Sequence, residues 1–227
     1  MGEPTSEAEL IARASAIAGL TLAELAAQLG WPAWDDLELG GTRRKGRVGQ
    51  LVEQALGAAS GSSRGPDLPT LGVEIKTLPL GRDGVPRETT FVCTVPLGDL
   101  ERTDFEDSVL AKRLARVLFV PIETEPGVAF GARRVGSAFL WSPSAAQLAQ
   151  LRADWEAVAQ LVAAGEIDSL DARLGEALQV RPKAANSTVR RVLASEDGTL
   201  SWASPRGFYL RRTFTTAIVR EAYAPRG

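Results

Sequence analysis

Residues 65–77 constrain the fold of this chain more than any other stretch. Pro66 and Pro69 exclude a regular helix there and leave Asp67 in an irregular segment. Beyond them, residues 71–78 alternate apolar and other side chains and contain Val, Ile and Thr, which favour strands. The sequence therefore predicts an irregular segment around Asp67 that leads directly into a β-strand.

This strand carries two side chains of opposite charge. Glu74 and Lys76 are two residues apart, so they point to the same face, roughly 6–7 Å apart along the chain. Asp67 can fold back onto that face. Mg²⁺ prefers hard oxygen ligands and is usually held by one or two carboxylates plus substrate phosphates, and Asp67 and Glu74 can supply the carboxylates. Lys76 can then orient a metal-bound water or offset charge in a phosphoryl transition state.

The spacing of these residues fits two interpretations. A Pro-Asp pair, six residues and then Glu-x-Lys resemble the signature of the PD-(D/E)xK nuclease superfamily. The same residues also fit an edge strand on which Glu74 and Lys76 form a solvated ion pair. The motif by itself leaves both a metal site and a surface pair open.

Composition limits the chemistry that such a site can use. None of the 227 residues is a histidine, which excludes Ser-His-Asp and Cys-His nucleophile pairs, His-rich zinc sites and an imidazole base. The single cysteine, Cys93, lies in an apolar run and indicates a buried thiol. Any catalysis must therefore use carboxylates, lysine, the backbone or a metal ion.

Charge is distributed unevenly along the chain. The net charge is −2, but residues 1–180 contain 17 basic and 25 acidic side chains, whereas residues 181–227 contain nine basic and three acidic ones. A polyanion is attracted to the C-terminal segment. Phe208 and Tyr209 lie there between arginines and can contact bases, although such runs are more often solvated surface.

Hydropathy indicates a cytoplasmic protein with no membrane contact. The sequence has no apolar run approaching the roughly 18 residues of a membrane-spanning helix. Its first residues are acidic and polar, unlike a signal peptide.

The helices predicted in the N-terminal part have clear start and stop signals. Capping boxes at residues 6–9 and 21–24 each open a helix. Residues 48–56 predict a helix with one apolar face, and Glu53 falls beside that face. Residues 40–47 before it suggest a flexible basic loop, either near phosphates or simply solvated. Glu53 is either an ordinary surface residue or a third carboxylate near Asp67.

The strands indicate a mixed α/β (α+β) fold. We expect the strand at 71–78 to form a β-hairpin with residues 88–95. Residues 117–122 are apolar throughout and predict a buried strand, and residues 144–164 predict a long helix. These elements make a mixed sheet flanked by helices, in one domain or two lobes.

Seven short segments along the chain form a recognisable set. They are GAASGS (57–62), LGVEIKT (71–77), ETTFVC (88–93), RRVGS (133–137), LWSP (140–143), RPKAAN (181–186) and PRGFYL (205–210). In this order and at this spacing they resemble the MutH family of bacterial DNA mismatch-repair endonucleases. The resemblance extends over roughly residues 7–220.

The resemblance implies a restriction-endonuclease-like fold in a single domain. A catalytic lobe at about residues 1–100 and a DNA-recognition lobe at about 101–227 would form a DNA-binding cleft. MutH-like proteins use Mg²⁺ to nick the unmethylated strand on the 5′ side of GATC in hemimethylated DNA. MutL stimulates them after MutS has found a mismatch. We expect this chain to act in the same way, as a monomer.

The resemblance also assigns catalytic residues by position. Asp67 and Glu74 match the metal-binding carboxylates, Lys76 the catalytic lysine and Glu53 the additional carboxylate. A second active-site lysine of the family aligns with Arg113, next to Lys112. Arginine keeps the charge but not the compact ammonium, so both of these residues are candidates.

The expected DNA contacts lie in the basic C-terminal segment. Arg181 and Lys183 match basic DNA-binding residues, and Tyr209 matches the aromatic residue that senses the adenine methyl group. We expect Arg206 and Arg211, on either side of Tyr209, to contact DNA as well.

Two other functions fit the same residues. A restriction-type endonuclease of this fold would cut both strands and would need a dimer on a palindromic site. A non-catalytic DNA-binding module would not need Asp67, Glu74 and Lys76.

Overall fold

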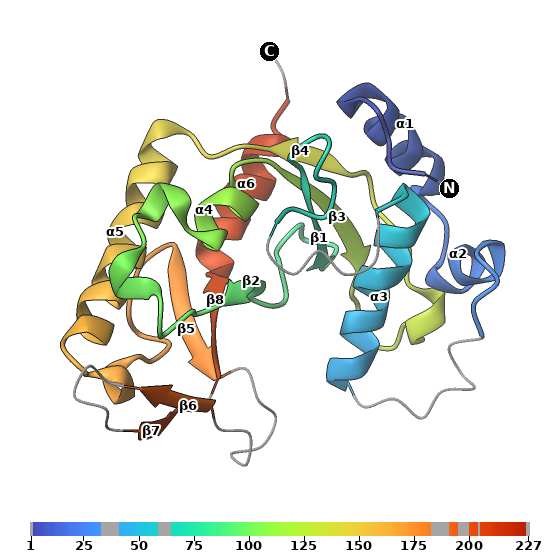
Figure 1. Ribbon diagram of the computed structural model, residues 1–227. Helices are drawn as coiled ribbons and strands as arrows, with labels where there is room; N and C mark the ends of the chain where they lie inside the picture. The colour runs from blue at the N-terminus through green and yellow to red at the C-terminus, as the bar shows by residue number, and fades with distance from the viewer. Residues whose placement is uncertain are drawn as a thin grey trace. The chain divides into compact units, whose positions relative to one another are not determined.

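The computed structural model describes residues 2–32, 41–58, 65–182, 191–194, 200–203 and 205–225, with the backbone alone for 41–45, 191–194 and 200–203. The chain divides into two units (Figure 1). The first consists of Met1–Glu88, Ala115–Ser142 and Thr216–Gly227, and the second of Thr89–Leu114 and Pro143–Thr215. The units interleave along the chain, unlike the continuous lobes expected at about 1–100 and 101–227.

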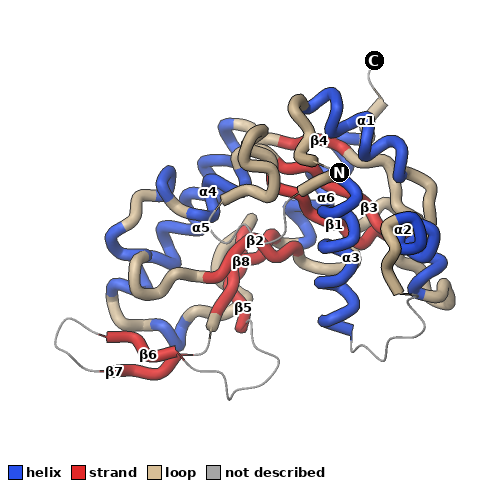
Figure 2. The backbone as a smooth tube through the Cα atoms, turned by 45° about the vertical axis from the view of Figure 1, so that its right-hand side comes forward, coloured by secondary structure: helices blue, strands red, loops and turns tan. Residues whose placement is uncertain are grey.

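A three-stranded mixed sheet forms the centre of the first unit (Figure 2). Its order is β1 (Glu74–Leu80), β3 (Val117–Glu123) and β4 (Phe139–Trp141), with β3 parallel to β1 and antiparallel to β4. Six of the seven residues of β3 are buried, because this strand lies between two others. The buried strand predicted at 117–122 is therefore confirmed.

Three helices cover this sheet and complete the core. They are α1 (Glu7–Ile17), α2 (Leu22–Gln28) and α3 (Gly41–Leu56). Both α1 and α2 pack against α3, and α3 packs against β1. Their apolar faces meet the sheet in one buried cluster, whose members include Leu10, Leu22, Leu51, Val52, Val73 and Val120.

The predicted helix starts are confirmed in position. The Ser6 hydroxyl accepts a hydrogen bond from the N–H of Glu9 at the start of α1, and Thr21 and Glu24 form the complete capping box of α2. The carboxylate of Glu9 accepts from Thr5 instead of from Ser6. These caps satisfy N–H groups that the first helical turn leaves without an intrahelical partner.

Two predictions about local structure are wrong. Residues 41–47 are not a loop but the first turns of α3, despite two glycines among them. The strand at 71–78 forms no hairpin with residues 88–95, because β1 pairs with β3 and β2 (Thr90–Thr94) pairs with β8 (Arg206–Leu210). Both strands have partners far away in sequence, and a local turn signal cannot reveal such a partner.

The second unit contains a separate antiparallel sheet. Its order is β2, β8 and β5 (Leu178–Pro182), and β6 (Arg191–Ala194) and β7 (Leu200–Ala203) form a two-stranded ribbon. The long helix α5 (Ala145–Ala163) packs against β5, and the short α4 (Val109–Leu114) packs against β2. Among the described residues, the second unit also contains η1 (Leu100–Arg102), η2 (Phe105–Asp107) and η4 (Ile167–Ser169), whereas η3 (Phe130–Ala132) belongs to the first unit and α6 (Arg212–Ala222) continues from the second into the first.

The architecture is the predicted α+β fold, with small sheets flanked by helices. Within the described ranges, no helix is both long enough and apolar enough to cross a membrane.

An ion pair fixes the N-terminal helix to the start of β3. The Arg116 guanidinium donates to both carboxylate oxygens of Glu7, at 2.8 and 2.6 Å. This interaction holds the pKa of the Glu7 carboxyl below its ordinary value of 4.5. A lowered folded-state pKa stabilises the protein above the unfolded-state pKa, and the stabilisation is lost as the pH falls through the folded-state value.

We therefore expect Glu7→Gln to be less stable than the parent protein at pH 7, by a difference that is smaller at pH 3. The two side chains are 43% and 32% exposed, so the cost in free energy of unfolding should stay below about 1 kcal/mol. Urea denaturation at both pH values measures the difference. An equal difference at both values would contradict this account.

Candidate functional site

A tight turn folds Asp67 back onto the start of β1. Leu68 and Val73 exchange two backbone hydrogen bonds, of 2.9 and 3.2 Å, and Gly72 between them has a φ of 65°, which favours glycine. The turn places the Asp67 carboxylate beside the strand, where Oδ2 accepts the N–H of Ile75 at 2.9 Å. Asp67 therefore folds back to the strand that carries Glu74 and Lys76, while its position on their face stays a prediction.

Glu74 and Lys76 share one face of β1, as predicted. The Glu74 side chain is fully buried, and its Oε1 lies 2.5 Å from Nζ of Lys76, which is 15% exposed. The interpretation of Glu74 and Lys76 as a solvated surface pair is therefore wrong. Burying a carboxylate costs free energy unless the charge is paired, and the adjacent Lys76 ammonium offsets that cost.

Backbone pairing holds Glu74 in place. Its N–H donates to the carbonyl of Arg116 at 2.9 Å, and Glu74 lies opposite Val117 in the parallel register of β1 and β3. The carboxylate consequently projects from a central, rigid sheet and not from a loop.

This donor set fits a hard divalent cation. Asp67 and Glu74 offer carboxylate oxygens near the start of one strand, and Asp67 is partly exposed. Among the described residues, no group of three or more Asp, Glu or Cys side chains is arranged to hold a metal ion alone. Mg²⁺ commonly uses only one or two protein carboxylates and takes its other ligands from water and substrate phosphates.

Glu53 lies on α3, the helix that packs against β1. Its carboxylate turns back along its own helix, since a Cβ built on Gly49 would lie 3.6 Å from Glu53 Oε1. Glu53 thus does not complete a cluster of three carboxylates. Its role as an additional carboxylate stays a prediction.

Lys112 and Arg113 both lie on α4, in the second unit. Arg113 is partly buried and donates to the carbonyl of Val92 in β2 at 3.0 Å. The Lys112 side chain is 52% exposed and donates to the carbonyl of Asp107 at 2.8 Å. These contacts do not decide which of the two serves as the second basic residue.

The second unit brings Arg181 and Tyr209 together on its sheet. The Arg181 guanidinium carbon lies 5.7 Å from the centre of the Tyr209 ring, and Nη1 donates to the hydroxyl of Thr89 at 3.2 Å. The Phe91 ring meets Tyr209 edge-on, with 5.3 Å between ring centres. Burial raises the pKa of Tyr209, while the nearby Arg181 acts in the opposite direction.

Sequence reasoning did not predict roles for Thr89 and Phe91. Phe91 lies opposite Tyr209 in the register of β2 and β8, and Thr89, just before β2, accepts a hydrogen bond from Arg181 of β5, because β2 and β5 flank β8 on its two sides. The available signal was the Thr- and Phe-containing strand at 88–95, but its partner in the sheet could not be read from the sequence.

Arg206 and Arg211 donate to backbone carbonyls of the second unit. Arg206 Nη1 donates to Leu170, and Arg211 donates to Ala172, Leu174 and Leu178. These bonds show a structural role for both arginines, and their DNA contacts stay predictions. Lys183 lies outside the described residues.

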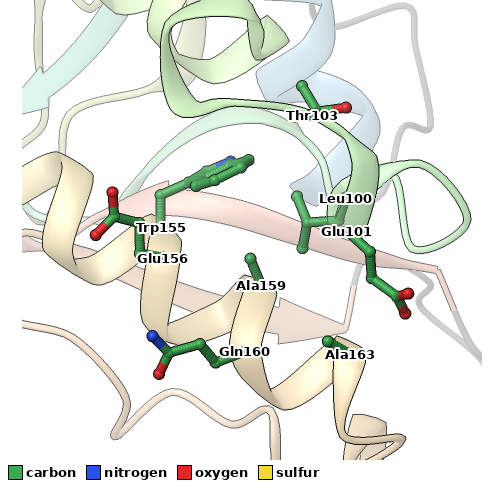
Figure 3. A pocket seen from close by; sticks show the side chains of 8 residues that line it. All are labelled: Leu100, Glu101, Thr103, Trp155, Glu156, Ala159, Gln160 and Ala163. Atoms are coloured by element: carbon green, nitrogen blue, oxygen red, sulfur yellow. The ribbon is translucent and has the colours of Figure 1, made fainter.

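The second unit also contains a pocket that none of these residues lines. It has a volume of about 290 Å³ and lies between α5 and the segment around η1 (Figure 3). Trp155 and the small side chains of Ala159 and Ala163 line it on the α5 side, together with Glu156. No predicted site residue lines this pocket.

Comparisons with known proteins show similarity over nearly the whole chain. The family model described as "DNA mismatch repair enzyme MutH" matches residues 56–154. The DNA mismatch repair protein MutH of Shewanella amazonensis is 48% identical over 220 residues, which cover 97% of this chain and 96% of that protein. The proteins of the same name from Shewanella sp. strain MR-7 and Shewanella baltica are 44% identical, with 97% of each chain covered. The similarity thus includes both units.

Proposed function

Because the chain belongs to the MutH family of DNA mismatch repair enzymes, we propose that it is an endonuclease that nicks the unmethylated strand 5′ to GATC in hemimethylated DNA. One observation supports this most. The turn at residues 68–73 places Asp67 against the amide of Ile75, beside the buried Glu74 and its partner Lys76. Two carboxylates and an ammonium at the start of one rigid strand suit phosphodiester hydrolysis.

Asp67 and Glu74 would hold the proposed Mg²⁺. When bound, such an ion supplies a Lewis acid for phosphate oxygens and an activated water. Lys76, next to Glu74, would orient the attacking water and offset negative charge that develops on the phosphate. Glu53 and one of Lys112 and Arg113 would assist. These roles need only carboxylates and cations, in keeping with a chain that has no histidine.

Recognition of double-stranded DNA is assigned to the second unit. Arg181 is exposed and would contact a phosphate, and Tyr209 would lie beside the adenine whose methyl group is sensed. Lys183, Arg206 and Arg211 are the further proposed contacts. Activation by MutL, after MutS has found a mismatch, and action as a monomer in the cytoplasm are proposed from family membership.

A supercoiled plasmid with a single unmethylated GATC tests the proposed activity. With Mg²⁺ we expect open circles to form before linear DNA, because one chain carries one such centre, and we expect added MutL to increase the rate. EDTA should stop the reaction. Linear DNA as the first product would favour the restriction-type enzyme, and intact plasmid under all conditions would favour a non-catalytic module.

Salt dependence tests the phosphate contact of Arg181. Each phosphate contact that is lost lowers the slope of log affinity against log salt by about 1, so we expect this change for Arg181→Ala. Titrations of a labelled duplex at several salt concentrations measure the slope. Arg173→Ala is the matched control, since its side chain is 94% exposed and paired with Asp171 in the same unit. An unchanged slope for Arg181→Ala would show that Arg181 does not contact a phosphate.

A further inference from the structure

A buried aspartate on α5 binds the chain where β5 begins. Asp154 is 8% exposed, although it carries a carboxylate. Its oxygens accept three consecutive backbone N–H groups, those of Glu176 at 3.0 Å, Ala177 at 2.7 Å and Leu178 at 2.8 Å. Charge-assisted bonds of this kind are among the stronger hydrogen bonds in proteins. Asp154 therefore fixes the entry to β5 from the helix that packs against it.

Arg211 binds the carbonyl groups of the same stretch. Its Nη2 donates to Ala172 at 2.7 Å and to Leu174 at 3.2 Å, and its Nε donates to Leu178 at 3.2 Å. Its backbone N–H also donates to the carbonyl of Ala177 at 2.8 Å. One carboxylate thus accepts the N–H groups of residues 176–178, and one guanidinium donates to the carbonyls of residues 172, 174 and 178.

Gly175 leaves room for this arrangement. Its φ is 82°, a conformation that side chains rarely adopt. A Cβ at this position would lie 2.6 Å from the carbonyl oxygen of Leu178 and 2.9 Å from Cγ of Asp154. The segment therefore passes so close to the carboxylate that it admits no side chain.

The segment leads directly to the Arg181–Tyr209 pair. In the antiparallel register of β5 and β8, Gln179 lies opposite Tyr209 and Arg181 lies opposite Gly207. This register places Arg181 diagonally across from Tyr209 on one face of the sheet. A slip by one residue would turn every side chain of β5 to the other face and would remove Arg181 from the ring.

We propose that Asp154 and Arg211 are positioning residues for DNA recognition, which fix the register of β5 and thereby hold Arg181 over Tyr209. Neither residue needs to touch DNA for this role. The proposal rests on the proposed function only in taking Arg181 and Tyr209 as the DNA-contacting pair.

Asp154→Asn and Arg211→Lys test the proposal in the full-length protein. Asparagine has a similar shape but brings an N–H group towards backbone N–H groups, and lysine cannot reproduce the planar fork of three bonds. We expect amide hydrogen exchange in residues 176–182 to accelerate about tenfold or more, with exchange in β1 and β3 unchanged. With a GATC duplex, KM should rise about tenfold while kcat changes less than about threefold, since binding is impaired and the hydrolytic residues are intact.

Asp171→Asn and Arg173→Lys are the matched controls. They lie in the same segment, are exposed and bond to each other, and neither reaches β5. Both should leave exchange, KM and kcat as in the parent protein. If Asp154→Asn unfolds, hydrogen exchange in Arg211→Lys decides, because Arg211 is also a proposed DNA contact and its KM alone would not separate the two roles.

The outcomes separate this proposal from the proposed function. A parent protein that cuts GATC, with unchanged exchange and KM in both variants, would overturn the positioning role and leave the nuclease intact. A fall in kcat as large as the rise in KM, with exchange raised throughout the chain, would show general destabilisation and would also overturn the proposal. A parent protein that cuts no GATC would refute the proposed function, and with it the recognition role, whereas exchange would still show whether Asp154 holds β5.

Discussion

We expect Asp67→Asn to remove DNA cleavage while the protein stays folded and still binds DNA. The asparagine oxygen can still accept the N–H of Ile75, so the turn that places the residue should persist. The lost charge is one of two carboxylates proposed to hold Mg²⁺. A metal ion contributes several kcal/mol of transition-state stabilisation, and about 1.4 kcal/mol corresponds to tenfold in rate, so we expect a loss of about 10³-fold or more.

Single-turnover cleavage of a GATC duplex measures this loss, and a binding titration in EDTA measures affinity. Asp83→Asn is the matched control. Like Asp67, Asp83 accepts a backbone N–H, that of Val85 at 3.0 Å, but it lies in an exposed loop. The control should cleave normally. A rate for Asp67→Asn above a tenth of the parent value would show that Asp67 is not a metal ligand.

Lys76→Met should be both inactive and unstable. The substitution removes the ammonium that lies 2.5 Å from a fully buried Glu74 carboxylate. Breaking a buried pair by removing one partner typically costs about 3–5 kcal/mol, and the slight exposure of Lys76 favours the lower end. Urea denaturation measures the free energy of unfolding, provided that the slope m stays constant.

The double variant Lys76→Met with Glu74→Gln separates stability from catalysis. Neutral glutamine removes the buried charge, so we expect most of the lost stability to return while cleavage stays absent. Lys112→Met serves as a stability control, since its exposed pair with Asp107 should contribute less than about 1 kcal/mol. A double variant no more stable than Lys76→Met would show that the charge of Glu74 does not cause the instability.

The strand that carries Glu74 and Lys76 was predictable because its signals are local. Alternation in residues 71–78 places Glu74 and Lys76 on one face, and the prolines around Asp67 allow it to turn back. The buried β3 was equally clear from its apolar run. None of these features depends on a distant partner.

The partners of the strands were not predictable in this way. The turn chemistry after β1 suggested a hairpin with residues 88–95, yet β1 pairs with β3, which begins 37 residues after Leu80 ends the strand. Parallel pairing needs a long crossover, and here the crossover passes through the second unit. The glycines before Val48 similarly suggested a loop, whereas packing of α3 against α1, α2 and β1 overrides their low helix propensity.

The roles of the arginines also required the structure. The basic composition of residues 181–227 correctly marks a cationic segment, but composition cannot distinguish an exposed guanidinium from one bonded to the backbone. Arg181 is exposed beside Tyr209, whereas Arg206 and Arg211 bind carbonyls of the segment before β5. Asp154 belongs to no sequence motif, and the role proposed for it is apparent only from its hydrogen bonds to three backbone N–H groups.

The central claim is best tested on three duplexes that differ only in methylation of one GATC, with both strands, one or neither methylated. Each is incubated with the protein and Mg²⁺, and each strand is scored separately on a denaturing gel. We predict cuts 5′ to GATC in unmethylated strands alone, so that the hemimethylated duplex is nicked once and the fully methylated duplex stays intact. Equal cutting of methylated and unmethylated strands, or cutting at another sequence, would contradict the proposal of a methyl-directed nickase.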